Sequence, residues 1–341
     1  MSMLSTTTKT TVPKGMREVT MSQAIREALA EEMRRDPTVF IIGEDVAEAG
    51  TPFKVLSGLV EEFGPARVLD SPISEAGITG LGVGGAMTGM RPVVDIMFGD
   101  FLGLAMDQIV NQAAKVHYMS GGKLKVPMVV RTTLGATRRT AAQHSQSLHA
   151  WVSHIPGLKV VLPSTPYDAK GLLKTAIRDD NPVIFFEDKM MFQLKGLIPD
   201  EEYTIPFGVA DIKRVGEDIT IVATSSMVQI ALAAAEQLAS MGISAEIIDP
   251  RTTFPLDKAT MIESAKKTSR AIVMDEGYER YGVTAEIAAT IAEGAFYYLD
   301  APVRRLGAMD VPVPFSPVLE DLTVPTPTIV VELAKTLCGI R

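Results

Sequence analysis

The sequence Asp70-Ser71-Pro72-Ile73-Ser74-Glu75-Ala76-Gly77 leads into a run of small residues that continues to Gly89. This run predicts a helix over Ile73–Gly89, with the acidic Glu75 at its start. A carboxyl group at the mouth of such an apolar helix is poorly solvated, which favours its neutral form and suits it to share a proton with a bound heterocycle. Acids at helix starts also simply complement the positive end of the helix dipole. From spacing alone, both interpretations of Glu75 stay open.

Outward from this helix, strands and helices alternate along the first half of the chain. Thr20 and Gln23 form a capping-box pattern that predicts a helix over Thr20–Arg35. Further helices are expected at Leu104–Met119 and Pro166–Arg178, and a polar loop at Gly135–Ser153. The intervening strands are almost continuously apolar, which is typical of a parallel sheet covered on both faces; they are Thr38–Ile42, Pro92–Met97, Val126–Thr132, Leu158–Pro163 and Pro182–Glu187.

A second α/β rhythm follows a break rich in glycine, proline and acidic residues. We therefore expect a flexible tail over 1–16, a first domain over 17–195, a linker over 196–210 and a second domain over 211–341. The second domain is predicted to contain strands and helices in alternation. In chain order they are Ile219–Ala223, Met227–Met241, Ser244–Ile248, Asp257–Lys267, Ala271–Met274, Gly282–Gly294, Val303–Leu306 and Thr326–Leu337.

Composition agrees with two globular domains. The chain has 341 residues, 46% of them hydrophobic and 22% charged, which is more than one ordinary core accommodates. Its net charge of −8 argues against a broad nucleic-acid surface. No apolar run is long enough to cross a bilayer. The single cysteine, Cys338, cannot form an internal disulfide, which fits a reducing compartment.

Gly80-Leu81-Gly82-Val83-Gly84-Gly85 satisfies the G-x-G-x-x-G pattern of dinucleotide-binding proteins. That fingerprint requires a strand directly before it and a glycine turn that opens the helix. Here the glycines fall inside the predicted helix, after Glu75. We therefore favour close packing of another helix or of a flat ligand against the backbone.

Histidines and strand-end acids supply the other candidates. The spacing of His144, His149 and His154 does not place three rings on one helical face, which argues against a zinc site. His144 lies in a polar run that could face a cleft and act on protons, although a plain surface position explains it too. Glu44 follows the first strand, at the edge where open α/β sheets bind ligands, and a solvated loop acid is the alternative.

Several motifs, in order along Arg17–Leu337, resemble the beta subunit of the thiamine-diphosphate-dependent decarboxylating component of 2-oxo acid dehydrogenase complexes. Among its members the chain is most similar to acetoin dehydrogenase, then to pyruvate and branched-chain enzymes. The motifs that carry the resemblance are Gly43-Glu44-Asp45-Val46, Pro72-Ile73-Ser74-Glu75, Gln143-His144-Ser145-Gln146, Pro156-Gly157-Leu158-Lys159-Val160-Val161, Asp168-Ala169-Lys170-Gly171-Leu172, Arg178-Asp179-Asp180-Asn181-Pro182 and Asp249-Pro250-Arg251-Thr252.

The resemblance implies a fold and a set of roles. It implies an N-terminal pyrimidine-binding parallel-sheet domain and a transketolase C-terminal-like α/β domain. Glu75 would hydrogen-bond the aminopyrimidine of the cofactor, and His144 would handle protons or orient the substrate and the lipoyl group. Phe101 would stack on the ring, with Glu44, Ile73 and Met97 as further cofactor-binding positions. Main-chain carbonyls would bind a structural potassium ion at Met128, Ala176, Ile177, Asp179 and Asn181.

The resemblance also implies partners. The family anchors the diphosphate through Mg²⁺ on a G-D-G motif of an alpha chain, and no Gly-Asp-Gly occurs here. We therefore expect half an active site, an α2β2 heterotetramer, a lipoyl-bearing acyltransferase partner, and a bacterial-type cytoplasmic location rather than the mitochondrial matrix. The reaction would be cleavage of acetoin or oxidative decarboxylation of pyruvate, with transfer of the acyl group to lipoamide. A branched-chain enzyme, a noncatalytic scaffold and a nicotinamide oxidoreductase are the alternatives.

Overall fold

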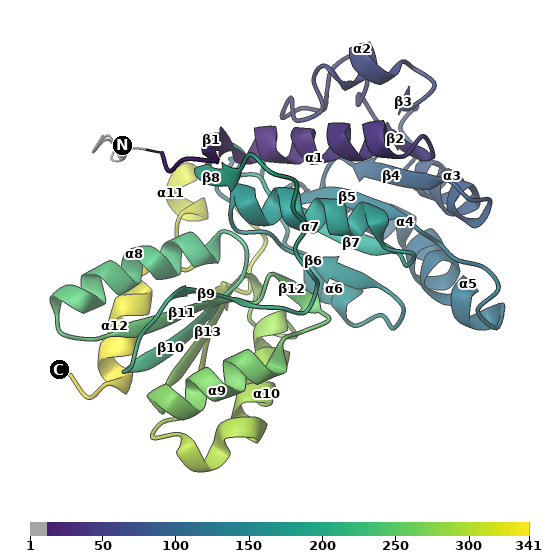
Figure 1. Cartoon of the computed structure of the whole chain (residues 1–341). Helices are drawn as coiled ribbons and strands as arrows, with labels where there is room; N and C mark the ends of the chain where they lie inside the picture. Colours follow the sequence, from purple (N-terminus) through teal and green to yellow (C-terminus); the bar gives the residue numbers. More distant parts are fainter. Residues whose placement is uncertain (1–11, 341) are drawn as a thin grey trace.

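A computed structural model describes residues 12–340, which form two α/β domains (Figure 1). The expected tail, 1–16, lies largely outside the described residues, and Met16 already belongs to a strand. The first domain is built on a seven-stranded sheet in the order β12-β6-β7-β5-β4-β2-β3. All its strands are parallel except β12 at one edge. Their bounds are β2 Val39–Gly43, β3 Val68–Asp70, β4 Arg91–Ile96, β5 Val129–Leu134, β6 Lys159–Val161, β7 Val183–Asp188 and β12 Thr252–Phe254.

Both faces of this sheet are covered by helices, as the apolar strands predict. Successive strand residues point to opposite faces, so Ile41 packs with α1 (Met21–Arg35) and α7 (Pro166–Arg178). Ile42 instead packs with α3 (Glu75–Met87) and the helices that follow β4. Each face therefore has its own apolar core. The remaining helices of the domain are α2 Leu59–Phe63, α4 Leu102–Met106, α5 Ala114–Met119 and α6 His149–Ser153.

Local signals place these helices well. The side chain of Thr20 accepts a hydrogen bond from the Gln23 amide, and the Gln23 side chain accepts from the Thr20 amide, which confirms the capping box. The helix expected over Leu104–Met119 is interrupted by a π-helical segment, Asp107–Ala113, between α4 and α5. The loop expected over Gly135–Ser153 ends in the short helix α6.

The second domain has a five-stranded sheet in the order β14-β13-β10-β11-β9, with only β9 antiparallel. Helices α8 and α12 share one core with this sheet, and α9 and α10 share another. The expected mostly parallel α/β fold is thereby confirmed in both domains. The bounds are β9 Asp211–Arg214, β10 Ile219–Ala223, β11 Ala245–Asp249, β13 Ala271–Tyr278, β14 Arg304–Ala308, α8 Met227–Ser240, α9 Lys258–Thr268, α10 Val283–Ala295, α11 Pro317–Glu320 and α12 Pro327–Leu337.

Two strand pairings tie distant segments together. β1 (Met16–Thr20) pairs antiparallel with β8 (Lys195–Pro199), which begins at the end of the expected first domain and continues into the segment expected as a linker. β12 belongs to the second half of the chain, yet it pairs with β6 of the first sheet. The two domains therefore share a sheet edge as well as a connecting segment.

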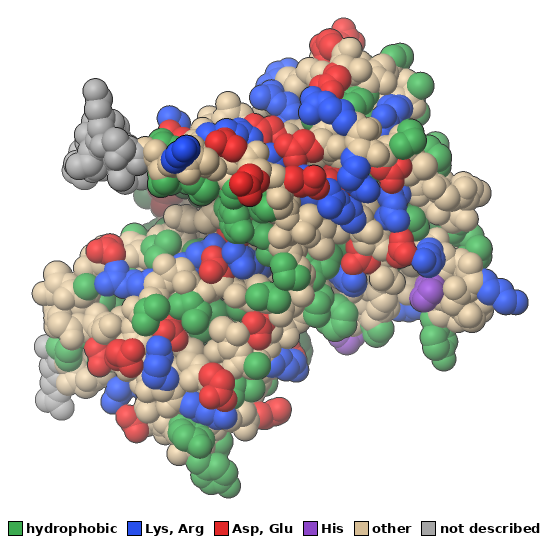
Figure 2. Space-filling model, in the orientation of Figure 1, with side chains coloured by type: hydrophobic (Ala, Val, Ile, Leu, Met, Phe, Trp, Pro, Cys, Tyr) green, Lys and Arg blue, Asp and Glu red, His purple; other side chains and the backbone are tan. Residues whose placement is uncertain are grey.

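Buried charges join the same two halves. Asp168 of α7 is fully buried and accepts hydrogen bonds from Arg251 Nε (2.8 Å) and Lys213 Nζ (2.6 Å). Both cations come from the second domain. On the surface, Figure 2 shows acidic and basic side chains interspersed over the face in view. Within residues 12–340, no helix combines the length and the apolar character that a membrane crossing requires.

Candidate active site

Glu75 is the first residue of α3, and the N-terminus of this helix lies at the carboxyl edge of the first sheet because α3 follows β3. The hydroxyl of Ser74 caps the helix by accepting a hydrogen bond from the Gly77 amide (3.3 Å). The Glu75 side chain is only 7% exposed. The structure thus confirms a buried acid at a helix start, the placement that the sequence predicts.

A second acid lies beside Glu75. Glu44 follows β2 directly, and burial raises the pKa of its carboxyl, with the negative charge of Glu75 raising it further. Its Oε1 is buried and has no hydrogen-bond partner among residues 12–340. Glu44 therefore lies as a half-buried acidic neighbour of the buried Glu75 at the end of β2.

Aromatic rings gather at the end of the neighbouring strand, β4. The ring of His144 lies edge-on to Phe101, with centroids 5.3 Å apart, and edge-on to Phe98 at 4.7 Å. Phe101 belongs to a short 3-10 helix, Gly99–Phe101, and is half-buried. The structure therefore brings the predicted His144 and Phe101 into one cluster, although they lie far apart along the chain.

The loop that carries His144 is held in an unusual conformation. Thr137, Arg139 and Ala141 all have positive φ values, between 60° and 69°. Residues with a Cβ rarely adopt this left-handed region and do so where surrounding contacts impose it. The loop is also fixed beyond His144, because Asp100 Oδ1 accepts hydrogen bonds from the Gln146 amide (3.2 Å) and side chain (3.0 Å).

Two buried acids of the second domain supply part of this restraint. Glu320, at the end of α11, accepts hydrogen bonds from the Thr137 amide (2.7 Å) and from the Arg139 guanidinium (2.6 Å). Glu276, in β13, accepts one from the Ala136 amide (2.6 Å). Burial and the neighbouring Asp188 raise the pKa of Glu276 well above its ordinary value. The second domain therefore shapes the loop that presents His144.

A buried ion cluster lies below the site, within the sheet. Arg131 of β5 pairs with Asp95 of β4 and, through two hydrogen bonds of 2.5 and 2.6 Å, with Glu187 of β7. Burial raises the pKa of Glu187 to about 7 and also raises that of Asp95. One guanidinium neutralises only one of two carboxylates, so the cluster retains a proton in the neutral range.

The remaining predicted cofactor positions lie at the same edge. Met97 directly follows β4 and is half-buried, whereas Ile73 is 82% exposed just before α3. Because β2 and β4 are neighbouring parallel strands, Glu44 and Met97 lie at one sheet edge. Ile73 is therefore an apolar side chain that is exposed to solvent two residues before the buried Glu75.

The predicted potassium positions also lie near one another, around the end of α7. Arg91, however, donates hydrogen bonds to two of the five carbonyls, those of Ile177 (3.0 Å) and Asp179 (2.9 Å). The Met128 carbonyl accepts from the Val183 amide. The main-chain N–H and the side-chain Nδ2 of Asn181 both donate to Oδ1 of the Asp179 carboxylate. A guanidinium thus already supplies positive charge to part of this carbonyl cluster.

The glycine motif has a packing role. All its glycines lie within α3, and a Cβ added at Gly82 would approach Val94 Cγ2 to 2.5 Å and Met128 Sδ to 3.0 Å. Gly82 therefore allows α3 to lie close on the sheet, and the motif lies inside the helix instead of in the turn between β3 and α3, where a dinucleotide site needs it. No cluster of three or more potential His, Cys, Asp or Glu metal ligands occurs within the described part of the chain.

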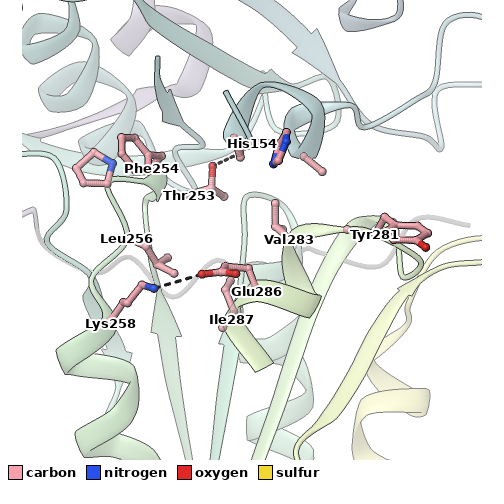
Figure 3. A pocket seen from close by; sticks show the side chains of 13 residues that line it. His154, Thr253, Phe254, Leu256, Lys258, Tyr281, Val283, Glu286 and Ile287 are labelled. Carbon is pink, nitrogen blue, oxygen red and sulfur yellow. Dashed lines mark hydrogen bonds and ion pairs between the residues drawn. The ribbon is translucent and has the colours of Figure 1, made fainter. Parts of the chain in front are cut away.

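A separate cavity of about 560 Å³ lies between the domains (Figure 3). The residues that line it include His154, which follows α6, and Phe254 of β12. From α10 come Val283, Glu286 and Ile287. Lys258 Nζ lies 3.2 Å from a carboxylate oxygen of Glu286. None of the predicted site residues lines this cavity. The buried acids and aromatic rings at the sheet edge are therefore the candidate active site.

Comparison with protein families decides the wider assignment. Residues 17–195 match the family "Transketolase, pyrimidine binding domain", and residues 208–330 match "Transketolase, C-terminal domain". The chain belongs to the transketolase pyrimidine-binding family. Members of this family depend on thiamine diphosphate.

Close relatives of this family member are dehydrogenase subunits. The beta subunit of acetoin:2,6-dichlorophenolindophenol oxidoreductase from Bacillus subtilis (strain 168) is 51% identical, over 95% of this chain and 98% of the relative. The beta subunit of the pyruvate dehydrogenase E1 component from Rhizobium meliloti (strain 1021) is 48% identical, over 96% of this chain and 72% of the relative. A solved structure titled "Split gene transketolase, inactive beta4 tetramer" shares the fold, with a TM-score of 0.76 at 22% identity, covering 94% of this chain and 99% of that one.

The residues of this family member fit a pyrimidine ring. Phe101 and Met97 offer half-buried apolar surface, and Glu75 offers a buried acid. Glu44 Oε1 and Asp100 Oδ2 are buried polar atoms without a hydrogen-bond partner among residues 12–340. Such atoms are costly unless a ligand or a further chain satisfies them.

Sequence reasoning missed three residues that hold the site together: Asp100, Lys189 and Glu320. Asp100 lies beside Phe101 and secures Gln146. Lys189 follows the two acids that end β7, and such a charged run after an apolar strand is a signal for the ligand edge of a sheet. Glu320 offers no such signal, because its partners lie in the other domain.

Proposed function

We propose that this chain is the beta subunit of a thiamine-diphosphate-dependent dehydrogenase component. With an alpha subunit it cleaves acetoin or oxidatively decarboxylates pyruvate, and it transfers the acyl group to lipoamide. The support is identity of 48–51% over nearly the whole chain to relatives of both kinds. The single structural observation that carries the proposal is the buried acid Glu75 at the edge where Phe101 and His144 also lie.

Thiamine diphosphate, when bound, would supply the carbanion chemistry needed to cleave a carbon–carbon bond next to a carbonyl. The Glu75 carboxyl would bind the aminopyrimidine through a hydrogen bond, with Glu44 beside it. Phe101, Met97 and Ile73 contact the ring and exclude water from it. His144 gives or takes protons at its imidazole, or orients the substrate and the lipoyl group.

The active site is completed by a partner. Ile73 is exposed beside the buried acid, and an alpha chain that covers it would exclude solvent from Glu75. We propose an α2β2 heterotetramer in which the alpha chain holds the diphosphate and Mg²⁺, a lipoyl-bearing acyltransferase as acceptor, and a cytoplasmic location. We also propose that potassium binds at the carbonyls around the end of α7, because oxygen atoms are the ligands that hard cations prefer. The Arg91 guanidinium already donates to two of these carbonyls, so the ion would share them with Arg91.

The decisive experiment is reconstitution with the alpha chain. The purified beta chain is expected to be inactive, and addition of the alpha chain is expected to give lipoamide-dependent turnover. A panel of acetoin, pyruvate and branched 2-oxo acids, assayed with lipoamide or an artificial electron acceptor, then identifies the donor. Robust catalysis by the beta chain alone, or an assembled but inactive heterotetramer across the whole panel, contradicts the proposal.

A further inference from the structure

Lys189 is a buried cation next to the candidate site that the proposed mechanism does not use. It follows β7, and its side chain has 0% exposure. Burial lowers the pKa of this lysine, and the nearby acids Asp100, Glu276, Asp188 and Glu320 counteract that effect. Burying an ammonium group is expensive unless specific contacts compensate for the lost water. The contacts of Lys189 therefore indicate what it is retained for.

Those contacts converge on His144. Lys189 Nζ donates a hydrogen bond to the main-chain carbonyl of His144. The same carbonyl accepts a second hydrogen bond, from Thr140 Oγ1 at 3.0 Å. Both lone pairs of this oxygen are thus used, and one of the two donors is the amino group of a lysine. The backbone at His144 is fixed from two sides.

A second contact of Lys189 is with Phe98, whose ring packs against the His144 imidazole. Lys189 Nζ lies 5.4 Å from the centroid of the Phe98 ring, within cation–π range. That phenyl ring lies edge-on to both His144 and Phe101, at 4.7 and 6.1 Å. Lys189 therefore contacts the aromatic cluster through Phe98 and the His144 backbone at the main-chain carbonyl.

Lys189 also anchors the strained part of the loop. Its own carbonyl accepts hydrogen bonds from Arg138 Nε (3.0 Å) and Nη2 (2.8 Å). Arg138 lies between two residues with positive φ, Thr137 and Arg139. One residue at the end of β7 thus binds the loop at two points, through its backbone and through its ammonium group.

We propose that Lys189 is a positioning residue that sets the place of the His144 imidazole against Phe98 and Phe101. Functional side chains work within narrow tolerances, and supporting hydrogen bonds maintain them. Only the activity arm of the test rests on the proposed function; the placement of His144 is measured without turnover.

The test compares Lys189→Met with Lys174→Met in the assembled heterotetramer. Lys174 is an equally buried lysine, 1% exposed, that pairs with Glu31 and makes no contact with the loop. One readout is kcat and KM for the donor. The other is the rate at which diethyl pyrocarbonate modifies His144 relative to the exposed His154, followed by mass spectrometry of the peptides.

Lys189→Met is expected to lower kcat about tenfold or more, the loss of one hydrogen bond to a charged group, with a smaller change in KM. It is also expected to raise the His144-to-His154 modification ratio several-fold, while Lys174→Met leaves both readouts near wild type. An unchanged modification ratio overturns the proposal whatever happens to kcat. Should Lys189→Met not assemble, Lys189→Gln, which keeps a polar donor in a neutral side chain, is judged by the same two readouts. If the wild-type enzyme is inactive, the modification ratio still decides the role of Lys189.

Discussion

Glu75 is a buried acid at the start of α3, and Glu44 at the end of β2 is its acidic neighbour. Glu75→Gln keeps the size of the side chain but removes the acid that binds the pyrimidine. We expect turnover of the reconstituted enzyme to fall almost to background, while the circular dichroism spectrum and the assembly with the alpha chain stay unchanged. Glu48→Gln, at an exposed position nearby, serves as the control. Retained activity of Glu75→Gln excludes the assigned role.

At this residue scale, the sequence predicts the acid, the ring and the histidine but not what holds them. Glu75, Phe101 and His144 carry their signals in local motifs. Lys189 and Glu320 act through contacts to residues far away along the chain, so a local pattern can place Lys189 at the ligand edge of the sheet but predicts the role of neither residue. A single sequence contains the chemistry of such residues but not their neighbours.

At the scale of elements, strands β4, β5 and β7 carry a buried cluster with a titration of its own. The folded-state pKa of Glu187 is raised from 4.5 to about 7. The folded protein therefore binds this proton more tightly than the unfolded chain does. The resulting stabilisation is fully present below about pH 4.5 and is lost as the pH rises through about 7.

We expect the Glu187→Gln variant to lack this pH dependence, since its side chain stays neutral. Relative to the variant, the wild-type free energy of unfolding should fall by on the order of 2–3 kcal/mol between pH 5 and about pH 8. Urea denaturation at a series of pH values measures it. Parallel pH curves for the two proteins refute the assigned protonation.

The loop between β5 and α6 is a second element whose conformation depends on a distant acid. Glu320→Ala removes the acceptor for the Thr137 amide and for Arg139. Because three residues in this loop hold left-handed conformations, we expect the freed loop to relax and become accessible to proteases. Limited proteolysis should cut the variant within 136–144 much faster than the wild type. Glu286→Ala, at a position of α10 that contacts no part of this loop, should cleave at the wild-type rate.

At the scale of the whole molecule, buried charges connect the two domains. Asp168→Asn removes the carboxylate that faces Arg251 and Lys213. It leaves these two cations with Asp211 and Asp249 as their remaining acidic partners, so the loss of stability should stay below the cost of about 3–5 kcal/mol that is typical of a buried charge left without any partner. The unfolding midpoint in denaturant should fall accordingly. Glu236→Gln, which breaks only the exposed pair with Arg214, should change stability by less than about 1 kcal/mol.

The alternation of strands and helices predicts both sheets and most of their elements, because the apolar runs are long and the caps are local. Short strands escape such a prediction. β12 has three residues, and β8 lies in a segment whose proline and glycine content suggests a linker. Both form only because a partner strand from elsewhere in the chain supplies hydrogen bonds. Tertiary pairing of this kind has no signal in a local window.

β12 has a consequence for how the polypeptide tolerates division. A gene cut near residue 208 would yield two products, and the second would carry Thr252–Phe254, the outermost strand of the other product's sheet. Neither fragment would keep all its strand pairings, because the first would expose the unpaired edge of β6 and the second would carry β12 without its partner strand. Co-expressed, the pieces should find one another and purify as a complex, so the boundary between domains in sequence is not a boundary between independently folding parts.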